Sequence, residues 1–447
     1  MKLTILGGGG FRVPLVHRAL LRDRAEGRVT HVTLHDLDGA RLDAVVRVLR
    51  EMSEDHADAP ALTVTTDLDE AVTGADFVFS AIRVGGLAGR VVDERVALDE
   101  GVLGQETVGP GGIAFGLRTI PVAVDIARRV ARLAPRAWVI NFTNPAGMVT
   151  EAMSHHLGDR VIGICDSPVG LGRRVSHALG VDPGRARLEY AGLNHLGWLR
   201  AVRVDGVDLL PRLLADDEAL ASFEEGRLFG ADWLRTLGAV PNEYLHYYYF
   251  QREAVAAAQA AEQTRGAFLL DQQRSFYDRM RVPGTPPFAT WDATRLEREA
   301  TYGADVREAA GAGERDAADL ESGGYERVAL ALMRAIARDE RTTLILNVRN
   351  RRVLESLDAD AIVEVPCHVD AGGARPIAGD PLPGHAAGLV TAVKSVERDV
   401  ILAATTGDRA AALRAFALHP LVDSVAVARR LLRGYLDRAP GLGYLRG

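Results

Sequence analysis

The start of the chain constrains the fold more than any other feature. An apolar run over residues 2–6 leads directly into four consecutive glycines, Gly7, Gly8, Gly9 and Gly10. Such a turn lets the main chain approach a pyrophosphate closely, and the N-terminus of the next helix favours the negative charge. The pattern departs from G-x-G-x-x-G, because Arg12 or Val13 stands where the third glycine would be. By itself, the turn is only a weak sign of a nucleotide site.

Asp36 strengthens this interpretation. It lies at the end of the second predicted strand, a little beyond the usual spacing, where its carboxylate would accept hydrogen bonds from the ribose hydroxyls of NAD. The same carboxylate disfavours the 2′-phosphate of NADP. The alternative is a tight turn and a helix-capping aspartate in a domain that binds no nucleotide.

Short apolar or β-branched runs alternate with helical patterns through the first third of the chain. The predicted strands are residues 2–6, 32–35, 62–66, 76–82, 137–140 and 161–164, and the predicted helices include residues 40–52, 116–133 and 145–156. This alternation predicts an α/β fold with a Rossmann-like, doubly wound parallel sheet. We expect an NAD-binding domain over residues 1–170.

The alternation changes after about residue 190. Longer helical patterns follow, and two runs at residues 344–348 and 362–369 predict a strand pair. The stretch 271–300 contains RVPGTPPFAT, which predicts a long surface loop. Three helices are expected near the end of the chain, over residues 389–404, 409–418 and 422–438. We expect a second, mixed α/β domain over residues 171–447.

Charge and composition narrow the functional classes. Lys and Arg number 53 against 60 Asp and Glu, so the net charge is −7, and both signs are spread along the chain. This balance argues against a nucleic acid or an anionic membrane as partner. The N-terminal apolar run is too short for a secretory signal, and no run approaches the roughly 18 apolar residues of a membrane span. We therefore expect a cytoplasmic protein.

Polar residues follow the predicted strands at the edge where open parallel sheets bind ligands. They are Arg83, Arg90, Asn141, Asn144, Cys165, Asp166 and, shortly afterwards, His195. Individually, several have structural explanations: Asn144 suits a helix N-cap before a proline, and Cys165 suits a core thiol. Arg83 could pair with Asp93 or Glu94. Together, they indicate a site beside the predicted nicotinamide.

Two further groups carry less specific signals. Cys165 and His195 offer soft and borderline ligands for a divalent transition metal, although their spacing alone indicates one weakly. Cys367, the second of two cysteines, has no predicted role. Four of the ten tyrosines fall within residues 244–249, where a buried amphipathic helix with hydroxyls at its edge is the favoured interpretation.

Five motifs together resemble glycoside hydrolase family 4, and within it the 6-phospho-β-glucosidases. They are Gly104–Thr107 with the glycine-rich residues 109–112, the Asn141–Ala146 turn, Cys165–Pro168, Gly192–His195 with Trp198, and Tyr244–Tyr248. They occur in the same order as in the family and span most of the chain.

The resemblance implies a fold like that of lactate and malate dehydrogenases, a tightly held NAD⁺ and a divalent metal, usually Mn²⁺. It makes Cys165 and His195 the metal ligands and Tyr244 the base at sugar C2. Arg90, Asn144 and Arg265 would hold the 6-phosphoglucosyl group of the substrate. The four glycines, Asp36 and Arg83 are assigned to the cofactor. Dimers or tetramers are typical of the family.

The implied reaction differs from the two-carboxylate mechanism of most glycosidases. Hydride leaves sugar C3 for NAD⁺, and the metal polarises the resulting ketone, which acidifies the C2 proton. Tyr244 removes that proton, the glycosidic oxygen is expelled, water adds and the hydride returns. The expected substrates are 6-phospho-β-glucosides such as phosphorylated disaccharides.

Asp166 leaves the anomer open. In the family, β-specific members usually carry Asn after the metal-binding Cys, whereas 6-phospho-α-glucosidases carry Asp as the acid that assists departure of the aglycone. We predict β specificity, because residues 118–121 and 141–148 resemble the β-type sequences. The alternative is a 6-phospho-α-glucosidase.

Two further hypotheses for the function remain. One is a 2-hydroxy-acid dehydrogenase with His195 as acid/base, and the other is a non-catalytic NAD-responsive binding protein. The dehydrogenase hypothesis leaves Cys165 and the tyrosines without roles.

Overall fold

The computed structural model describes residues 1–301 and 324–445. Within them, one 13-stranded sheet follows the order β10-β8-β7-β12-β11-β6-β5-β4-β1-β2-β3, with β13 and β9 paired at its side. Its parallel half comprises β1 (Lys2–Leu6), β2 (His31–His35), β3 (Ala61–Thr65), β4 (Phe77–Ser80), β5 (Trp138–Asn141) and β6 (Val161–Gly163). The predicted doubly wound sheet is confirmed, and each of the six predicted strands is present.

The antiparallel half continues the same sheet. It comprises β7 (Arg187–Leu193), β8 (Leu196–Val204), β9 (Val207–Asp208), β10 (Val240–Pro241), β11 (Thr342–Arg349), β12 (Ile362–Asp370) and β13 (Gly373–Pro376). The predicted strand pair is β11 and β12, and Asn347 of β11 pairs with Gly163 of β6 to join the two halves. The β7–β8 hairpin was not predicted, because its turn uses Asn194 and His195 in place of a glycine-containing pair. The domain boundary near residue 170 stays a prediction.

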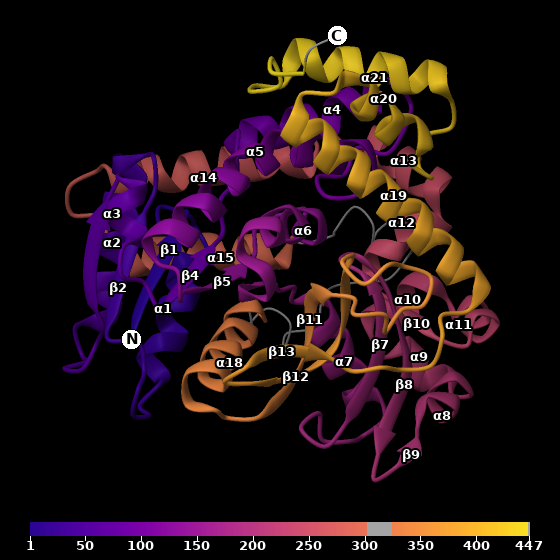
Figure 1. Cartoon of the computed structure of the whole chain (residues 1–447), viewed down its shortest axis with the longest axis horizontal. Coiled ribbons are helices and arrows are strands. Elements are labelled where there is room, and N and C mark those ends of the chain that lie inside the picture. The colour runs from indigo at the N-terminus through magenta and orange to yellow at the C-terminus, as the bar shows by residue number, and fades with distance from the viewer. Residues whose placement is uncertain (302–323, 446–447) are drawn as a thin grey trace.

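The parallel strands separate two apolar cores, because alternate residues point to opposite faces. Phe77 and Phe79 contact the core that includes α1 (Val13–Arg22) and α2 (Gly39–Ser53). Val78 contacts the core of the opposite face. That second core includes α5 (Gly109–Leu133), α6 (Ala146–Leu157), α19 (Gly384–Thr406), α20 (Arg409–Leu418) and α21 (Val425–Arg438), so the three predicted C-terminal helices are confirmed (Figure 1).

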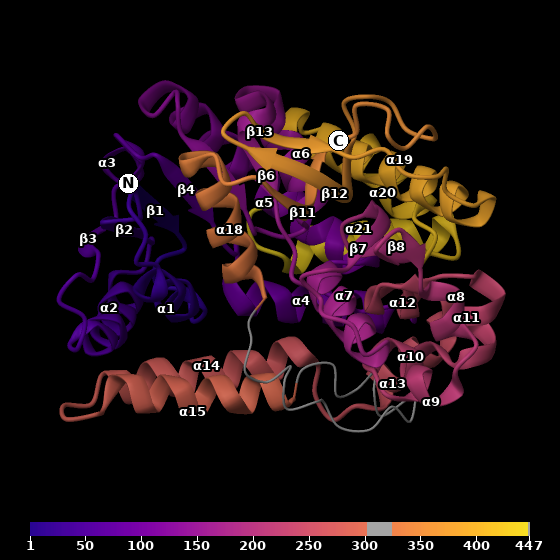
Figure 2. The same ribbon diagram turned by 90° about the horizontal axis from the view of Figure 1, so that it is seen from below.

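The stretch 271–300 corrects the sequence prediction. It forms most of a helical hairpin, α14 (Arg265–Met280) and α15 (Pro287–Ala300), and the proline- and glycine-rich residues are confined to the turn between them. Buried aromatic side chains such as Phe276 and Trp291 pack the hairpin against the first core. Figure 2 shows the two helices running side by side beneath α1 and α2. The prolines and glycine of this stretch predict a loop, but burial of the flanking apolar side chains stabilises two helices.

The remaining helices are short or lie around the sheet. They are α3 (Leu68–Val72), α4 (Gly86–Asp99), η1 (Gly158–Arg160), α7 (Ser167–Ala178), α8 (Leu210–Leu214), α9 (Asp217–Ala221), α10 (Glu224–Phe229), α11 (Ala231–Leu237), η2 (Glu243–Leu245), α12 (His246–Tyr249), α13 (Gln251–Ala260) and α18 (Tyr325–Arg338). No helix in the described part of the chain has the length and apolar character needed to cross a membrane.

Candidate active site

A cavity of about 930 Å³ lies at the carboxyl edge of the parallel strands. All the predicted site residues line it except Gly8, Gly9 and Asn141: Gly7, Gly10, Asp36, Arg83, Arg90, Asn144, Cys165, Asp166, His195, Tyr244 and Arg265. Asn141 is buried, and its Nδ2 donates to Thr150 Oγ1 at 3.0 Å. The lining residues come from eight separate stretches of the chain between residues 7 and 265. The folded chain therefore brings the two predicted groups, cofactor and sugar, to one cavity.

The glycine-rich turn is held tightly against the ends of the neighbouring strands. Gly7 has φ +84°, and a Cβ on it would lie 2.6 Å from the carbonyl oxygen of Ala81. The main-chain nitrogens of Gly7 and Gly8 both donate to the carbonyl oxygen of His35, at 2.9 and 2.7 Å. The nitrogen of Gly9 donates to Asp36 Oδ2 at 3.1 Å. A side chain at Gly7 would push the turn away from the end of β4, and one at Gly8 would push it away from the end of β2.

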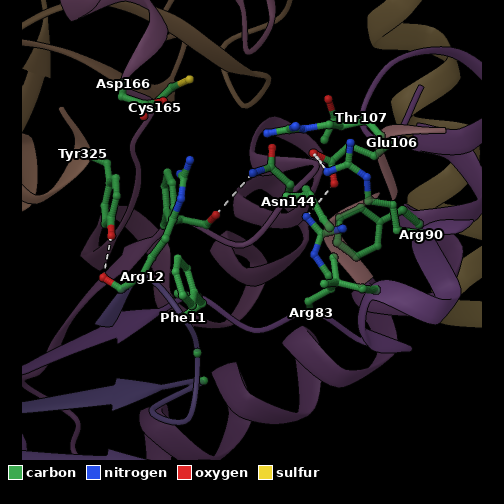
Figure 3. Close-up of a pocket in the computed structure, with 18 of the residues that line it drawn as sticks. Phe11, Arg12, Arg83, Arg90, Glu106, Thr107, Asn144, Cys165, Asp166 and Tyr325 are labelled. Atoms are coloured by element: carbon green, nitrogen blue, oxygen red, sulfur yellow. Dashed lines mark hydrogen bonds and ion pairs between the residues drawn. The ribbon is translucent and has the colours of Figure 1, made fainter. Parts of the chain in front are cut away.

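Glu106 bridges the two predicted arginines (Figure 3). Its Oε2 lies 2.6 Å from Arg83 Nη2, and its Oε1 lies 2.7 Å from Arg90 Nη1. Burial favours the neutral acid, but the two guanidiniums outweigh it and lower the pKa of Glu106 to about 2. The suggested pairing of Arg83 with Asp93 or Glu94 is wrong, because Glu106 takes that position. Sequence reasoning used Glu106 only as part of a motif and missed this contact.

Asp93 and Glu94 each form an ion pair with an arginine other than Arg83. Arg90 Nε donates to Glu94 Oε1 at 2.7 Å, and Asp93 is held by both terminal nitrogens of Arg118 at 2.8 and 2.7 Å. Arg90 is therefore held by carboxylates on two sides while it lines the cavity.

Thr107 orients the imidazole of His195. Thr107 Oγ1 lies 3.0 Å from His195 Nδ1 and 3.1 Å from Gln105 Oε1. A hydrogen bond at Nδ1 leaves Nε2 of the ring for other partners. Burial lowers the pKa of His195 to about 4, so the ring is neutral at pH 7. The Tyr244 ring stacks on it, with centroids 3.7 Å apart.

Cys165 and Asp166 follow β6 and both line the cavity. Burial, with the nearby carboxylates of Glu364 and Asp166, raises the pKa of the Cys165 thiol well above its usual value. Asp166 is the N-cap residue of α7, but its side chain makes no capping hydrogen bond. In residues 1–301 and 324–445, no group of three or more His, Cys, Asp or Glu side chains is arranged to hold a metal ion.

Asn144 does not cap the helix that follows it. Helix α6 begins at Ala146 with Pro145 as its N-cap residue, so the structural explanation for Asn144 is wrong. Its Nδ2 lies 3.4 Å from the carbonyl oxygen of Phe142, and its buried Oδ1 has no hydrogen-bond partner. Because Asn144 lines the cavity, this amide oxygen is available to a ligand.

The tyrosine cluster is not one amphipathic helix. It consists of the 3₁₀ turn η2 and the single turn α12. Tyr244 and Tyr247 line the cavity, whereas Tyr249 lies away from it and its Oη accepts a hydrogen bond from Trp198 Nε1 at 2.9 Å. The interpretation as one amphipathic helix is therefore wrong, and Tyr244 belongs to the 3₁₀ turn that precedes α12.

Sequence reasoning missed several arginines that line the cavity, among them Arg12 and Arg298. Burial, with the positive charges of Arg12, Arg265 and Arg90, lowers the pKa of Arg298 to about 9. Its buried Nε has no hydrogen-bond partner. Arg265 is the first residue of α14 and Arg298 lies near the end of α15, so the antiparallel hairpin brings the two residues together. Arg265 Nη2 donates to the carbonyl oxygen of Arg298 at 2.9 Å. Arg298 could not be predicted as a site residue, because the sequence predicts a surface loop over residues 271–300.

Comparison with known families decides the class of protein. The family model described as Family 4 glycosyl hydrolase matches residues 2–181, and the model of its C-terminal domain matches residues 190–422. The chain belongs to glycosyl hydrolase family 4. The resemblance that the five motifs predicted is confirmed.

Relatives in family 4 include enzymes named for both anomers. The chain is 33% identical over 445 residues to a probable 6-phospho-beta-glucosidase of Bacillus subtilis, covering 98% of this chain and 96% of the relative. It is 29% identical over 452 residues to a 6-phospho-alpha-glucosidase of Leptotrichia buccalis, covering 97% of each.

Solved structures agree with the fold of this family 4 chain. The 6-phospho-beta glucosidase of Thermotoga maritima, solved with manganese, NAD⁺ and glucose-6-phosphate, is 26% identical with a TM-score of 0.84 over 98% of each chain. A malate dehydrogenase from Plasmodium falciparum, 13% identical with a TM-score of 0.51 over 91% of this chain and 98% of its own, shares the fold alone. The predicted dehydrogenase-like fold is confirmed.

Proposed function

We propose that this family 4 glycosidase hydrolyses 6-phospho-β-glucosides with the help of NAD⁺ and a divalent metal such as Mn²⁺. The observation that carries the proposal is the convergence of three groups in one cavity. These are a glycine-rich turn with a carboxylate, a thiol with an imidazole, and a set of arginines with an amide. A 2-hydroxy-acid dehydrogenase would need the first group, His195 and one arginine, and would leave Cys165 and Tyr244 without roles. The 6-phospho-beta-glucosidases of Bacillus subtilis and Thermotoga maritima described above support the proposal by their similarity to this chain.

The glycine-rich turn fits the cofactor. Its main chain can approach a pyrophosphate because no side chain intervenes, and Asp36 Oδ2 is already oriented by the nitrogen of Gly9. Asp36 would accept hydrogen bonds from the adenosine ribose. NAD⁺, when bound, supplies a reversible hydride acceptor for sugar C3. Arg83, which follows β4 and lines the cavity, remains a predicted cofactor contact.

Cys165 and His195 fit a metal by their chemistry. A thiolate and a neutral imidazole suit a divalent transition metal, and the Thr107 contact at Nδ1 leaves Nε2 of His195 as the nitrogen that would bind it. Two protein ligands leave further positions open to substrate oxygens. The metal, when bound, supplies a positive charge that favours the Cys165 thiolate and acidifies the proton at sugar C2.

Tyr244 would take that proton. Its ring is held face to face with His195, and it lies near enough to Arg90 for their charges to interact. A nearby guanidinium favours the phenolate form of tyrosine. Asp166, which also lines the cavity, would protonate the departing aglycone oxygen.

The arginines form the end of the cavity that would hold the sugar phosphate. Mutual repulsion among Arg12, Arg265, Arg298 and Arg90 is one reason why the pKa of Arg298 is low. A phosphate dianion relieves that repulsion and accepts charge-assisted hydrogen bonds from the guanidiniums. Asn144 Oδ1 would accept a hydrogen bond from a sugar hydroxyl. Neutral disaccharides should therefore be poor substrates.

The proposal is tested with p-nitrophenyl 6-phospho-β-glucoside and its α-anomer, assayed with NAD⁺, Mn²⁺ and a reductant and with each component omitted in turn. Turnover of the β-anomer alone, lost without NAD⁺ or metal, is the expected result. Turnover of the α-anomer would favour the second candidate, a 6-phospho-α-glucosidase, for which Asp166 after Cys165 is the specific observation. Turnover of neither anomer would overturn both.

A further inference from the structure

Three aromatic side chains from the second half of the chain donate hydrogen bonds to the main chain around the glycine-rich turn. Tyr277 Oη donates to the carbonyl oxygen of Gly9 at 2.7 Å. Trp291 Nε1 donates to that of Phe11 at 2.8 Å, and Tyr325 Oη to that of Arg12 at 2.8 Å. Figure 3 shows the Tyr325 contact beside Phe11 and Arg12. The three donors lie on α14, α15 and α18, more than 260 residues along the chain from their acceptors.

These contacts are buried, so each is costly to lose. Tyr277 is 7% exposed, Trp291 0% and Tyr325 1%. A buried donor or acceptor without a partner pays its full desolvation cost, so the turn is held in one position relative to the hairpin. The Tyr325 ring also stacks on Phe142, with centroids 4.3 Å apart, which fixes the direction of its hydroxyl.

The Tyr277 contact reaches the carboxylate that would bind the cofactor ribose. Gly9 accepts from Tyr277 through its carbonyl oxygen and donates to Asp36 through its nitrogen. The Arg41 guanidinium lies over the Tyr277 ring, 4.8 Å from its centroid, and Arg41 also lines the cavity beside Asp36. Tyr277 therefore fixes the residue that in turn orients Asp36.

We propose that Tyr277 and Tyr325, with Trp291, are positioning residues for the dinucleotide: they hold the glycine-rich turn in its binding geometry from the second half of the chain. The proposal rests on the proposed function, because it takes NAD⁺ as the ligand of that turn. The same hairpin carries Arg265 and Arg298 at its other end. One element thus sets the cofactor turn and the phosphate-binding arginines at a fixed separation.

The test measures NAD⁺ binding to the cofactor-free full-length protein by titration calorimetry. The variants are Tyr277→Phe and Tyr325→Phe, which remove one hydroxyl each and keep the ring. We expect each to weaken NAD⁺ binding about three- to tenfold, the effect of one buried hydrogen bond. Tyr435→Phe is the matched control, because Tyr435 is buried and its Oη donates to the carbonyl oxygen of Asp93 at 2.8 Å, on a helix outside the turn.

A second readout separates positioning from general stability. Tyr277→Phe should narrow the preference for NAD⁺ over NADP⁺, because Asp36 is less firmly oriented, whereas Tyr325→Phe should weaken both cofactors alike. Thermal unfolding should shift by similar amounts in all three variants. If Tyr277→Phe does not fold, Tyr325→Phe decides by its affinity alone.

The outcomes distinguish this inference from the function on which it rests. A wild-type protein that does not bind NAD⁺ overturns both. A wild-type protein that binds NAD⁺ while the Phe variants bind it as tightly as the Tyr435→Phe control overturns only the positioning role.

Discussion

The two sides of the cavity are built from different parts of the chain. On the proposed cofactor side, main-chain groups of the turn over residues 7–10 are fixed by hydrogen bonds to the end of β2. On the proposed sugar side, recognition depends on single side chains from distant elements, among them Arg90 on α4, Tyr244 in η2 and Arg298 on α15. From this difference we infer that one substitution on the sugar side can abolish catalysis without changing the conformation of the glycine-rich turn.

The largest effect is expected at Cys165. In Cys165→Ser, metal-dependent turnover should fall to the level seen without metal, because a serine hydroxyl does not replace a thiolate ligand. Affinity for NAD⁺, measured by calorimetry, should stay within twofold of wild type, about 0.4 kcal/mol. Cys367→Ser is the control: Cys367 is equally buried, and its Sγ donates to the carbonyl oxygen of Val365 at 3.3 Å. Wild-type turnover in Cys165→Ser would remove the metal assignment.

The next effect is expected at Tyr244. Tyr244→Phe should lower kcat by about 10² to 10⁴, the usual contribution of a general base, with little change in NAD⁺ affinity. Tyr249→Phe provides the comparison, because Tyr249 belongs to the same cluster but accepts from Trp198 outside the cavity. Steady-state kinetics on the nitrophenyl substrate measures both. Equal losses in the two variants would mean that Tyr244 acts only through packing.

A smaller effect is expected at the arginine end of the cavity. Arg298→Gln should lower kcat/KM for a 6-phosphoglucoside about ten- to a hundredfold, mainly through KM, because a charge-assisted contact to phosphate is lost. Arg295→Gln on the same helix is the control, since Arg295 pairs with Asp292 at 2.9 Å and does not line the cavity. If KM is the same in both variants, Arg298 does not contact the phosphate.

The last expected effect is on stability and concerns neither side of the cavity. Burial lowers the pKa of His419 to about 3, whereas in the unfolded chain it is near 6.5. The unfolded state therefore binds more protons between these values, and stability falls as the pH falls through this window. Urea unfolding at pH 7.5 and pH 5 should show a larger loss in wild type than in His419→Gln, by about 2 kcal/mol. Equal losses would place the proton uptake elsewhere.

The cofactor side of the cavity could be predicted from the sequence better than the sugar side. The glycine turn, Asp36, Cys165 and Asp166 could be found because each directly follows a strand, and the sheet edge gathers them. Tyr244 and Arg265 came only through the family resemblance, since nothing local aims them at the cavity. Arg298 was missed because proline and glycine in the turn at residues 281–286 obscured the hairpin.

The sequence did not predict that Glu106 pairs with two arginines or that Tyr277 donates to the carbonyl oxygen of Gly9. Both join residues that are distant in the chain, and a single sequence gives no sign of such pairs. The strand hairpin β7–β8 was missed for a local reason, because the turn residue His195 adopts φ +60° without a glycine to mark it.

The central claim is that the reaction passes through removal of the C2 proton, and one measurement tests it most directly. The preferred nitrophenyl 6-phosphoglucoside is hydrolysed in D₂O with NAD⁺ and Mn²⁺, and the released glucose 6-phosphate is analysed by proton NMR. The account predicts deuterium at C2 of the product and no net NADH. A product that keeps its C2 proton, as the two-carboxylate mechanism gives, would contradict it.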